Sequence, residues 1–271
     1  MRRALALAAD YATRRVAFGR PLAAHPLHVE TLAAMAVEYE GAFHLTFHLG
    51  ALLGKEECDE ASDEELLLLR LLTPVAKLYT GKQAVAVASE ALEAFGGAGY
   101  VEDTGLPRLL RDAQVLSIWE GTTNVLSLDV LRAMGGEGDA LGAFRAAVAR
   151  RLDALTEPTL RALAPRVAEA LRRIDADAES AALADAAYRQ AGARGLAYAL
   201  ARTYVASLLL EHADWCARRD PGEGPRAATA AARWCAQDLA PLGAPDEAHR
   251  TASASLVCAA SLAPRAAVTL S

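Results

Sequence analysis

Aromatic side chains are scarce in this sequence: Phe, Trp and Tyr together make up 6% of its 271 residues. Hydrophobic residues nevertheless reach 53%, with Ala and Leu in long runs. Such usage is typical of packed helices, whereas sheets are rich in aromatic and β-branched residues. The composition therefore predicts an all-α protein, and the chain is long enough to bury a core without covalent cross-links.

Cysteine patterns that hold metals or disulfides are missing as well. The four cysteines, Cys58, Cys216, Cys235 and Cys258, show no C-x-x-C spacing, so they predict reduced thiols and no metal site. No apolar run is long enough to cross a bilayer, and the first residues lack a secretory-signal pattern. We expect a cytoplasmic location, or the mitochondrial matrix for a eukaryotic source, and no membrane partner.

The sequence also lacks a basic excess. Its net charge is -6, and residues 1–134 hold 12 basic and 18 acidic side chains of the total 28 and 34. The remaining residues therefore hold 16 of each (28 - 12 and 34 - 18). Because DNA-binding surfaces concentrate Lys and Arg, the charge argues against DNA as a partner.

Helical patterns fill the first half of the chain. Residues 2–17 carry an apolar stripe that predicts a helix ended by Gly19 and Pro21, and residues 26–53 predict a second helix ended by Gly54. The expected buried face of the second helix consists of Leu27, Leu32, Met35, Tyr39, Phe43, Phe47 and Ala51.

An acidic stretch over residues 56–65 predicts a solvated loop, because like charges so close together repel one another. Ser62 and Glu65 have the spacing of a capping box, so a long helix should begin there and run to about Ala94. It should end in the glycine-rich turn at residues 95–99, where glycine permits unusual backbone angles and close approaches.

Two further helices are predicted, over residues 106–113 and from an irregular turn at 118–122 to Met134. The glycine-rich residues 135–138 form the best domain boundary, since Lys is absent beyond them. About five more helical stretches follow, the longest over residues 193–217. The predicted architecture is a four-helix bundle over residues 1–134 followed by an additional Ala- and Arg-rich helical domain over residues 135–271.

The segment at residues 117–124, S-I-W-E-G-T-T-N, is the best candidate for chemistry. Flanked by Ile118 and Trp119, the Glu120 carboxyl should be partly desolvated, which raises a carboxyl pKa towards the range of a general base. Gly121 would let a ligand approach the backbone. From composition alone, the simpler interpretation is that Glu120 caps the following helix.

Four motifs occur together in this chain: R-V-A-F-G at residues 15–19, F-G-G-A-G-Y at 95–100, L-R-D-A at 110–113 and W-E-G-T-T-N at 119–124. In this order and spacing they resemble the C-terminal part of the acyl-CoA dehydrogenase family. The resemblance covers residues 2–134 and implies an FAD-dependent enzyme of fatty acid metabolism that dehydrogenates an acyl-CoA between its α and β carbons.

By the same resemblance, Glu120 is the catalytic base that removes the α-proton, and its backbone amide helps to stabilise the enolate oxygen. Trp119 and Gly121 would contact the substrate. The implied FAD-binding residues are Arg15, Phe18, Leu22, His25, Glu93, Gly96, Gly97, Thr122 and Asn124. A homodimer or homotetramer is implied because the family shares each flavin between subunits, with an electron-transfer flavoprotein or a similar protein as acceptor.

Glu93 departs from the Gln that straight-chain dehydrogenases usually carry before the glycine turn. An acidic residue there, together with the sequences of residues 117–121 and 128–132, is similar to the alkylation-response branch of the family. That branch leaves an alternative function open: a non-catalytic flavoprotein that binds a fatty acyl chain or DNA in a stress response. The family's N-terminal helical domain and middle β domain have no counterpart here, which predicts a fragment or a truncated relative.

Weaker candidates have simpler interpretations. Glu40, His44 and His48 share one helical face at a spacing that can hold a metal, but a polar edge of a bundle helix is the simpler interpretation. His28 is expected to be structural, and Arg132 to form a salt bridge. Trp215 and Trp234 could stack on nucleic-acid bases, but isolated helical aromatics more often fill a core.

Overall fold

The computed structural model describes residues 1–220, 222–243 and 256. Within them the regular secondary structure is helical except for one two-stranded antiparallel hairpin, so the predicted all-α class is confirmed. The elements follow in this order: α1 (Arg2–Arg14), β1 (Val16–Ala17), β2 (Arg20–Pro21), η1 (Leu22–Ala24), α2 (Pro26–Glu57), α3 (Asp63–Ala94), α4 (Gly97–Tyr100), η2 (Glu102–Thr104), α5 (Pro107–Leu116), α6 (Thr123–Met134), α7 (Ala140–Asp153), α8 (Pro158–Arg161), α9 (Ala164–Leu183), α10 (Ala186–Arg219) and α11 (Gly224–Cys235).

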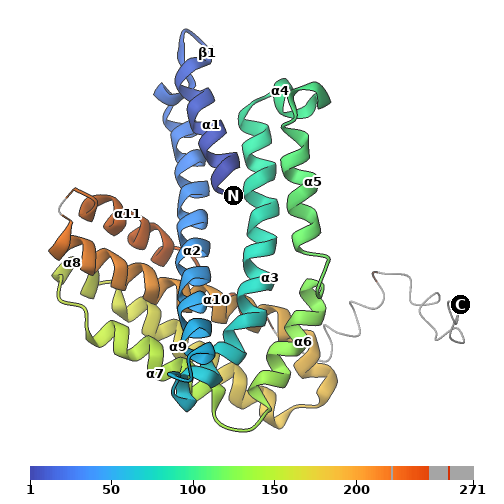
Figure 1. The fold of residues 1–271 in the computed structure, drawn as a ribbon, viewed down its shortest axis with the longest axis vertical. Helices are drawn as coiled ribbons and strands as arrows, with labels where there is room; N and C mark the ends of the chain where they lie inside the picture. The colour runs from blue at the N-terminus through green and yellow to red at the C-terminus, as the bar shows by residue number, and fades with distance from the viewer. Residues whose placement is uncertain (221, 244–255, 257–271) are drawn as a thin grey trace, which may run out of the picture.

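Four helices of the first half, α1, α2, α3 and α5, run along the long axis of the molecule (Figure 1). The hairpin and α4 lie at the same end of this bundle. Helices α7 to α11 pack around the opposite end of α2 and α3, and α10 contacts α2, α3 and α6. One end of the bundle is therefore covered by α7 to α11. The other end, which carries the hairpin and α4, is called the free end.

Local sequence signals set the ends of α3 as predicted. The Ser62 backbone N–H donates to Glu65 Oε2 at 3.0 Å, and the Glu65 N–H donates to Ser62 Oγ at 3.3 Å, which completes the capping box. At the other end Gly96 adopts φ +58°, and a Cβ on Gly99 would lie 1.9 Å from the Leu92 carbonyl oxygen. The chain can therefore turn tightly after α3 only because these two positions are glycine.

The predicted ends of the first two helices are wrong. The first helix stops at Arg14 instead of Ala17, because Val16 and Ala17 pair with the hairpin strand that follows the Phe18–Gly19 turn. The second helix continues through Gly54 to Glu57, since one glycine inside a long helix costs only about 1 kcal/mol relative to alanine. The acidic loop is correspondingly shorter than predicted and covers only residues 58–62.

The predicted buried face of α2 is also wrong. Of that stripe only Met35 is buried, whereas Leu27, Phe43 and Phe47 are exposed, Phe47 by 65%. The reason is that α10 and α11 cover another side of the helix. The residues of α2 that are buried are Met35, Val37, Gly41, Ala42, Leu45 and Leu52.

In the described part of the chain, no helix is long and apolar enough to pass through a membrane.

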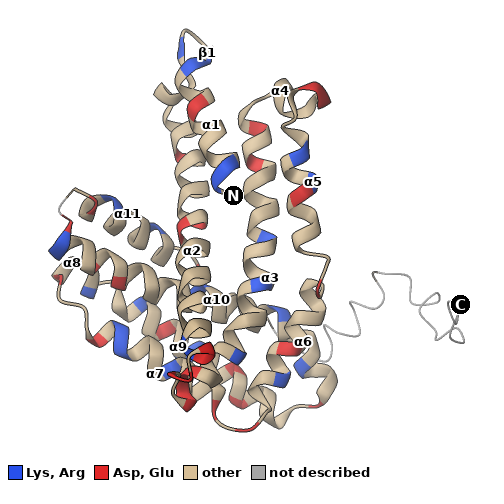
Figure 2. Ribbon diagram, viewed as in Figure 1, with Lys and Arg blue, Asp and Glu red and all other residues tan. Residues whose placement is uncertain are grey.

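The two halves of the chain meet in one hydrophobic core. Tyr79 of α3 and Trp234 of α11 are fully buried in it, with ring centroids 6.3 Å apart. Lys and Arg are interspersed with Asp and Glu along the helices (Figure 2). Three ion pairs join second-half arginines to first-half glutamates: Arg150–Glu64 at 2.6 Å, Arg226–Glu40 at 2.5 Å and Arg233–Glu30 at 2.8 Å. These three arginines of the second half therefore help to attach it to the bundle.

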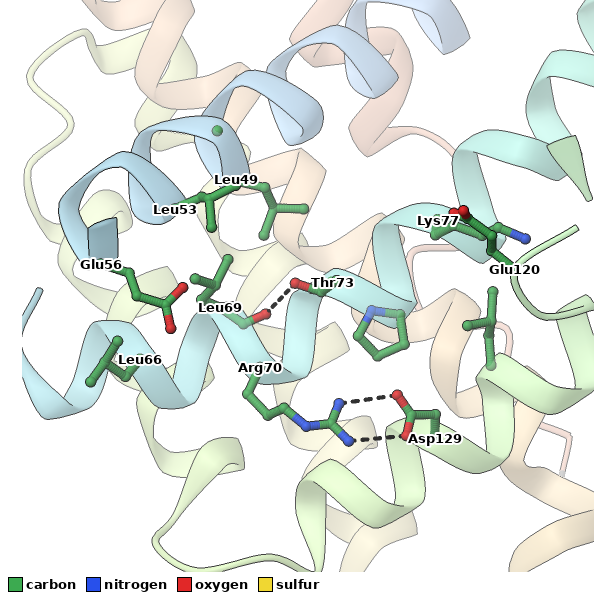
Figure 3. Close-up of a pocket in the computed structure, with 13 residues that line it drawn as sticks. Leu49, Leu53, Glu56, Leu66, Leu69, Arg70, Thr73, Lys77, Glu120 and Asp129 are labelled. Carbon is green, nitrogen blue, oxygen red and sulfur yellow. Dashed lines mark hydrogen bonds and ion pairs between the residues drawn. The ribbon is translucent and has the colours of Figure 1, made fainter. Parts of the chain in front are cut away.

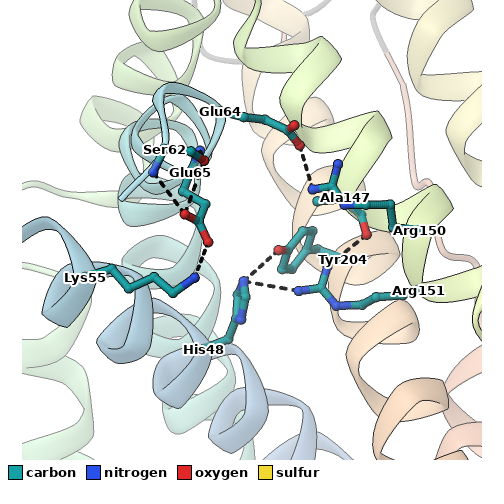
Figure 4. A network of polar contacts seen from close by, with 9 residues as sticks. All are labelled: His48, Lys55, Ser62, Glu64, Glu65, Ala147, Arg150, Arg151 and Tyr204. Atoms are coloured by element: carbon teal, nitrogen blue, oxygen red, sulfur yellow. Dashed lines mark hydrogen bonds and ion pairs between the residues drawn. The ribbon is translucent and has the colours of Figure 1, made fainter. Parts of the chain in front are cut away.

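A polar network lies where α2 meets α7 and α10 (Figure 4). His48 Nε2 accepts hydrogen bonds from Tyr204 Oη at 2.7 Å and from Arg151 Nη2 at 3.3 Å. An imidazole that accepts at Nε2 carries its proton on Nδ1 and is neutral. Burial and the nearby Arg151 guanidinium accordingly lower the pKa of His48 to about 4. Burial and the neighbouring His212 lower the pKa of His44 to about 4 as well.

Protonation of these two histidines should therefore destabilise the fold in mild acid. Between pH 6.5 and 4 the unfolded chain binds protons at His44 and His48 that the folded chain does not. The stability that depends on these two neutral histidines is therefore fully present above pH 6.5 and is lost as the pH falls towards 4. We expect a loss of about 2 kcal/mol per histidine at pH 4.5, less than full burial would give, because both rings are partly exposed. Urea unfolding of wild type and of His44→Gln/His48→Gln across this range measures it.

The double variant is the control for other groups that titrate nearby. Burial raises the pKa values of Glu38 and Glu40, whose contribution to the pH dependence has the opposite sign. Since these carboxyls remain in both proteins, they cancel in the comparison. A double variant that loses as much stability as wild type between pH 7 and 4.5 would contradict the assignment.

Candidate active site

Glu120 lies in the connection between α5 and α6, with a left-handed backbone at φ +51°. Its carboxylate has no hydrogen-bond or ion-pair partner among residues 1–220, 222–243 and 256. Glu120 lines a hollow of about 590 Å³ together with Lys77 (Figure 3). The same two residues also line a second hollow of about 420 Å³, so they lie at the junction of the two. An unpaired carboxylate between two hollows is free to react with a bound molecule.

Lys77 of α3 holds the backbone on both sides of Glu120. Its Nζ donates to the Trp119 carbonyl oxygen at 2.7 Å and to the Gly121 carbonyl oxygen at 2.5 Å. A left-handed conformation costs a non-glycine residue about 1–2 kcal/mol, whereas a hydrogen bond from a charged donor contributes about 1.5–3 kcal/mol. Two such bonds therefore outweigh the backbone strain at Glu120.

Gly81 lies one turn further along α3 and allows the same segment to approach the helix. A Cβ at this position would lie 3.0 Å from the Leu116 carbonyl oxygen. Positions 77 and 81 share a helix face. On this face α3 provides the Lys77 ammonium as a hydrogen-bond donor and, at Gly81, the space for a close backbone approach. The α5–α6 connection is thereby held against α3 at two points.

The backbone amide of Glu120 is a free donor. Its N–H makes no hydrogen bond within the described residues, although the N–H groups of Ile118 and Trp119 both donate to Val115 O. The cap of α6 is Thr122, whose Oγ1 accepts from the Val125 N–H at 3.5 Å. The interpretation of Glu120 as a helix cap is therefore wrong, and both its carboxylate and its amide are available.

The predicted desolvation of Glu120 by its neighbours is not seen. Ile118 and Trp119 are 61% and 57% exposed, and Glu120 itself is exposed. The buried residue of this turn is Ser117, and the three residues that follow it are exposed. Within the described part of the chain, the segment presents Glu120 on an open surface.

The hollows beside Glu120 are mainly apolar. The larger one lies between α2, α3 and α6, and Arg70 at its edge forms a bidentate pair with Asp129 at 3.0 Å (Figure 3). Its apolar lining consists of Leu49, Leu53, Leu66, Leu69, Pro74 and Leu126. The smaller hollow is lined by the exposed aromatic side of α2, Tyr39, Phe43 and Phe47, with Leu116 and Trp119. Both hollows suit an apolar chain.

A second group of predicted site residues surrounds the hairpin at the free end of the bundle. Phe18 is 96% exposed at its tip with φ +50°. His25 supports the tip, since its Nε2 donates to the Ala17 carbonyl oxygen at 3.0 Å and its Nδ1 accepts from Arg20 Nε at 3.3 Å. Arg15 is exposed, and Leu22 is partly buried beside it. The hairpin thus presents an aromatic ring and a cation to solvent.

Glu93, Gly96 and Gly97 lie at the turn from α3 into α4, where all three are exposed. This turn and the hairpin share the free end of the bundle, whereas the segment with Trp119, Glu120, Gly121, Thr122 and Asn124 lies lower, between α5 and α6 (Figure 1). The predicted site residues therefore form two groups, one at the free end of the bundle and one around Glu120. Within a single chain these two groups are separated.

The weaker candidates have structural partners. Glu40 pairs with Arg226, the His44 ring contacts the His212 ring with centroids 4.4 Å apart, and His48 bonds Tyr204. No group of three metal-ligating side chains could hold a metal ion in the described residues. Arg132 pairs with Asp129 at 3.0 Å, and Trp234 is buried while Trp215 is half-exposed.

The fold and these motifs define the class of the domain: a helical bundle with a hairpin and a glycine turn at one end and an aromatic-E-G-T segment along its side. Residues 1–135 match the family described as acyl-CoA dehydrogenase, C-terminal domain. Residues 139–262 match the family described as acyl-CoA dehydrogenase 11 C-terminal domain-like. The chain belongs to the acyl-CoA dehydrogenase family, as the four motifs predicted.

Individual relatives agree. The chain is 48% identical over 219 residues to acyl-CoA dehydrogenase family member 11 of Caenorhabditis elegans, covering 79% of this chain and 36% of that protein. It is 42% identical over 134 residues to the putative acyl-CoA dehydrogenase AidB of Escherichia coli (strain K12), covering 49% and 24%. The crystal structure of C. elegans ACDH-11 in complex with C11-CoA superposes with a TM-score of 0.86 at 40% identity, covering 94% of this chain and 44% of that chain. The chain thus spans less than half the length of these relatives.

Proposed function

We propose that this chain is the helical C-terminal part of an FAD-dependent acyl-CoA dehydrogenase and that Glu120 is its catalytic base. The observation that carries the proposal is the Glu120 carboxylate, which has no partner in the described residues and lies between two apolar hollows on a backbone fixed by Lys77. An acyl-CoA offers the matching chemistry, an apolar chain with a weakly acidic proton beside its thioester. The structure of one relative, C. elegans ACDH-11, was solved in complex with C11-CoA.

The chain's own groups would divide the reaction as follows. The Glu120 carboxylate accepts the α-proton, and the free Glu120 N–H donates to the thioester oxygen as negative charge develops on it. FAD, when bound, supplies the acceptor for the hydride that leaves the β-carbon. Trp119 and Gly121 flank the base and contact the substrate. The product is a trans-2-enoyl-CoA, and an electron-transfer flavoprotein or a similar protein reoxidises the cofactor.

The residues at the free end of the bundle fit FAD. Arg15 offers an exposed cation to a pyrophosphate, Phe18 an exposed ring to a flat heterocycle, and the Gly96 turn an approach that no Cβ obstructs. Leu22 and His25 make hydrogen bonds that support the hairpin beside Arg15 and Phe18. Glu93 and Gly97 complete this group, and Thr122 and Asn124 would contact the flavin from beside Glu120.

One chain does not bring these two groups of residues together. The hairpin and glycine turn lie at the end of the bundle, and the Glu120 segment lies along its side (Figure 1). A dinucleotide that touches both groups is therefore best shared between copies of the protein, which supports a homodimer or a homotetramer. We further propose that residues 1–134 form a bundle domain and residues 135–271 a second domain docked on it. Residues 221, 244–255 and 257–271 of the second domain lie outside the described residues.

The alternative of DNA binding loses its support from charge. Arg150, Arg226 and Arg233 pair with glutamates of the first half and are not free for phosphate. The apolar hollows agree with fatty-acyl binding in either function, so only chemistry separates a dehydrogenase from a non-catalytic acyl-binding flavoprotein.

The test is anaerobic addition of saturated acyl-CoAs of 4 to 18 carbons to the FAD-loaded full-length protein. We expect the flavin absorbance to bleach with at least one chain length and an enoyl-CoA to form in equal amount. If the flavin stays oxidised with every chain length while acyl-CoA binds, the protein is a non-catalytic acyl-binding flavoprotein. A flavin-free protein would contradict the cofactor assignment.

A further inference from the structure

We propose that Lys77 is a positioning residue for the α-proton abstraction: its ammonium group fixes the turn at Glu120 and polarises the peptide whose N–H meets the substrate's thioester oxygen. This inference rests on the proposed function. Its structural half, that Lys77 holds the turn, stands on geometry alone.

The geometry singles out one peptide. The Trp119 carbonyl and the Glu120 N–H belong to the same peptide unit, and the carbonyl accepts from Lys77 Nζ at 2.7 Å. The N–H at the other end of this unit makes no hydrogen bond within the described part of the chain. Hydrogen bonds in series strengthen one another because each polarises the next. A cation on the carbonyl therefore makes the Glu120 N–H a better donor to a developing negative charge.

The second hydrogen bond of Lys77 sets the direction of that donor. By also binding Gly121 O at 2.5 Å, the ammonium bridges the carbonyls before and after Glu120. With both carbonyls turned towards α3, the left-handed residue between them directs its N–H and side chain elsewhere. The same group thus aligns the amide and the carboxylate, the two groups that the proposed reaction requires.

The position of Lys77 supports a dedicated role. It is partly buried and lines both hollows, and its ammonium group donates to two backbone oxygens, with no carboxylate partner in the described part of the chain. Gly81 keeps the helix close enough for the side chain to reach, since a Cβ there would press on Leu116 O at 3.0 Å.

The experiment compares wild type, Lys77→Met, Lys77→Arg and the control Lys82→Met in the FAD-loaded full-length protein. Lys82 is on the same helix but five residues away and therefore on another face. Three quantities are measured: the rate of flavin reduction by undecanoyl-CoA, the long-wavelength absorbance formed with 3-thiaundecanoyl-CoA, and the amide exchange of residues 117–122. The 3-thia analogue can lose its α-proton but does not pass on a hydride, so its absorbance reports enolate stabilisation alone.

We expect Lys77→Met to slow flavin reduction about 10- to 100-fold and to weaken enolate formation by a similar factor. Amide exchange of residues 117–122 should accelerate at least about tenfold. Lys77→Arg, which keeps the cation, should recover part of each loss, and Lys82→Met should match wild type. Unchanged reduction and enolate absorbance in Lys77→Met would overturn the catalytic half of the proposal.

Amide exchange separates this inference from the proposed function. If wild type gives neither reduced flavin nor enolate, the dehydrogenase assignment fails. Faster exchange in Lys77→Met would still support the structural half of the inference, the clamp that Lys77 forms on the turn at Glu120. Unchanged exchange in Lys77→Met would overturn the clamp whether or not the enzyme is active.

Discussion

Glu120→Gln in the FAD-loaded full-length protein should slow flavin reduction by an acyl-CoA about 10³-fold while the protein keeps its yellow colour. The amide side chain is almost isosteric with the carboxylate but cannot accept the α-proton. The Glu120 carboxylate has no partner in the described residues, so the exchange breaks no ion pair, and stability should remain the same. Stopped-flow absorbance measures the reduction, and urea unfolding measures the stability.

Two further variants sharpen this prediction. Glu120→Asp keeps a carboxylate, and Asp tolerates the left-handed backbone at this position. It withdraws the base by one methylene, so the loss should be smaller, about 10- to 100-fold. Glu137→Gln changes an exposed glutamate in the α6–α7 connection and should leave the rate unchanged. A Glu120→Gln protein that is reduced as fast as wild type would remove Glu120 from the chemistry.

Local features of the fold could be predicted where a few neighbouring residues determine them. The capping box at Ser62 fixed the start of α3, and the glycines after Ala94 fixed its end, because each depends on hydrogen bonds or backbone angles within a few residues. The hairpin was not predicted from the sequence. Its strands are two residues each, and the turn uses Phe18 at φ +50°, a residue that such turns rarely carry.

Long-range features could not be predicted. The stripe with Phe43 and Phe47 resembles a core face in the sequence. Which side of α2 is buried, however, depends on α10 and α11, and α10 begins only at Ala186. Lys77 was overlooked for the same reason. Its partners are backbone carbonyls at positions 119 and 121, and a backbone acceptor leaves no residue signature in the sequence. The motif identified Glu120 itself, whereas only the fold identifies what holds it.

Trp234→Ala should lower the free energy of unfolding by about 3–5 kcal/mol, the largest stability effect we expect from one substitution in this chain. The indole is fully buried, and its Nε1 donates to the Arg202 carbonyl oxygen at 2.9 Å. The ring fits against α2 at Gly41, where a Cβ would lie 2.5 Å from indole carbon Cζ3. Urea unfolding followed by far-UV circular dichroism measures the loss, and Trp215→Ala, at a half-exposed position, should cost only about 1 kcal/mol.

The fit between Trp234 and Gly41 also predicts the sign of their coupling. Gly41→Ala alone should cost about 1–3 kcal/mol, since the new methyl group overpacks the site against the indole ring and a Val205 methyl group 2.9 Å away. In the Gly41→Ala/Trp234→Ala double variant the methyl group enters the cavity that the indole leaves, so the total loss should be smaller than the sum of the single losses. Additive losses would mean that the two side chains do not touch.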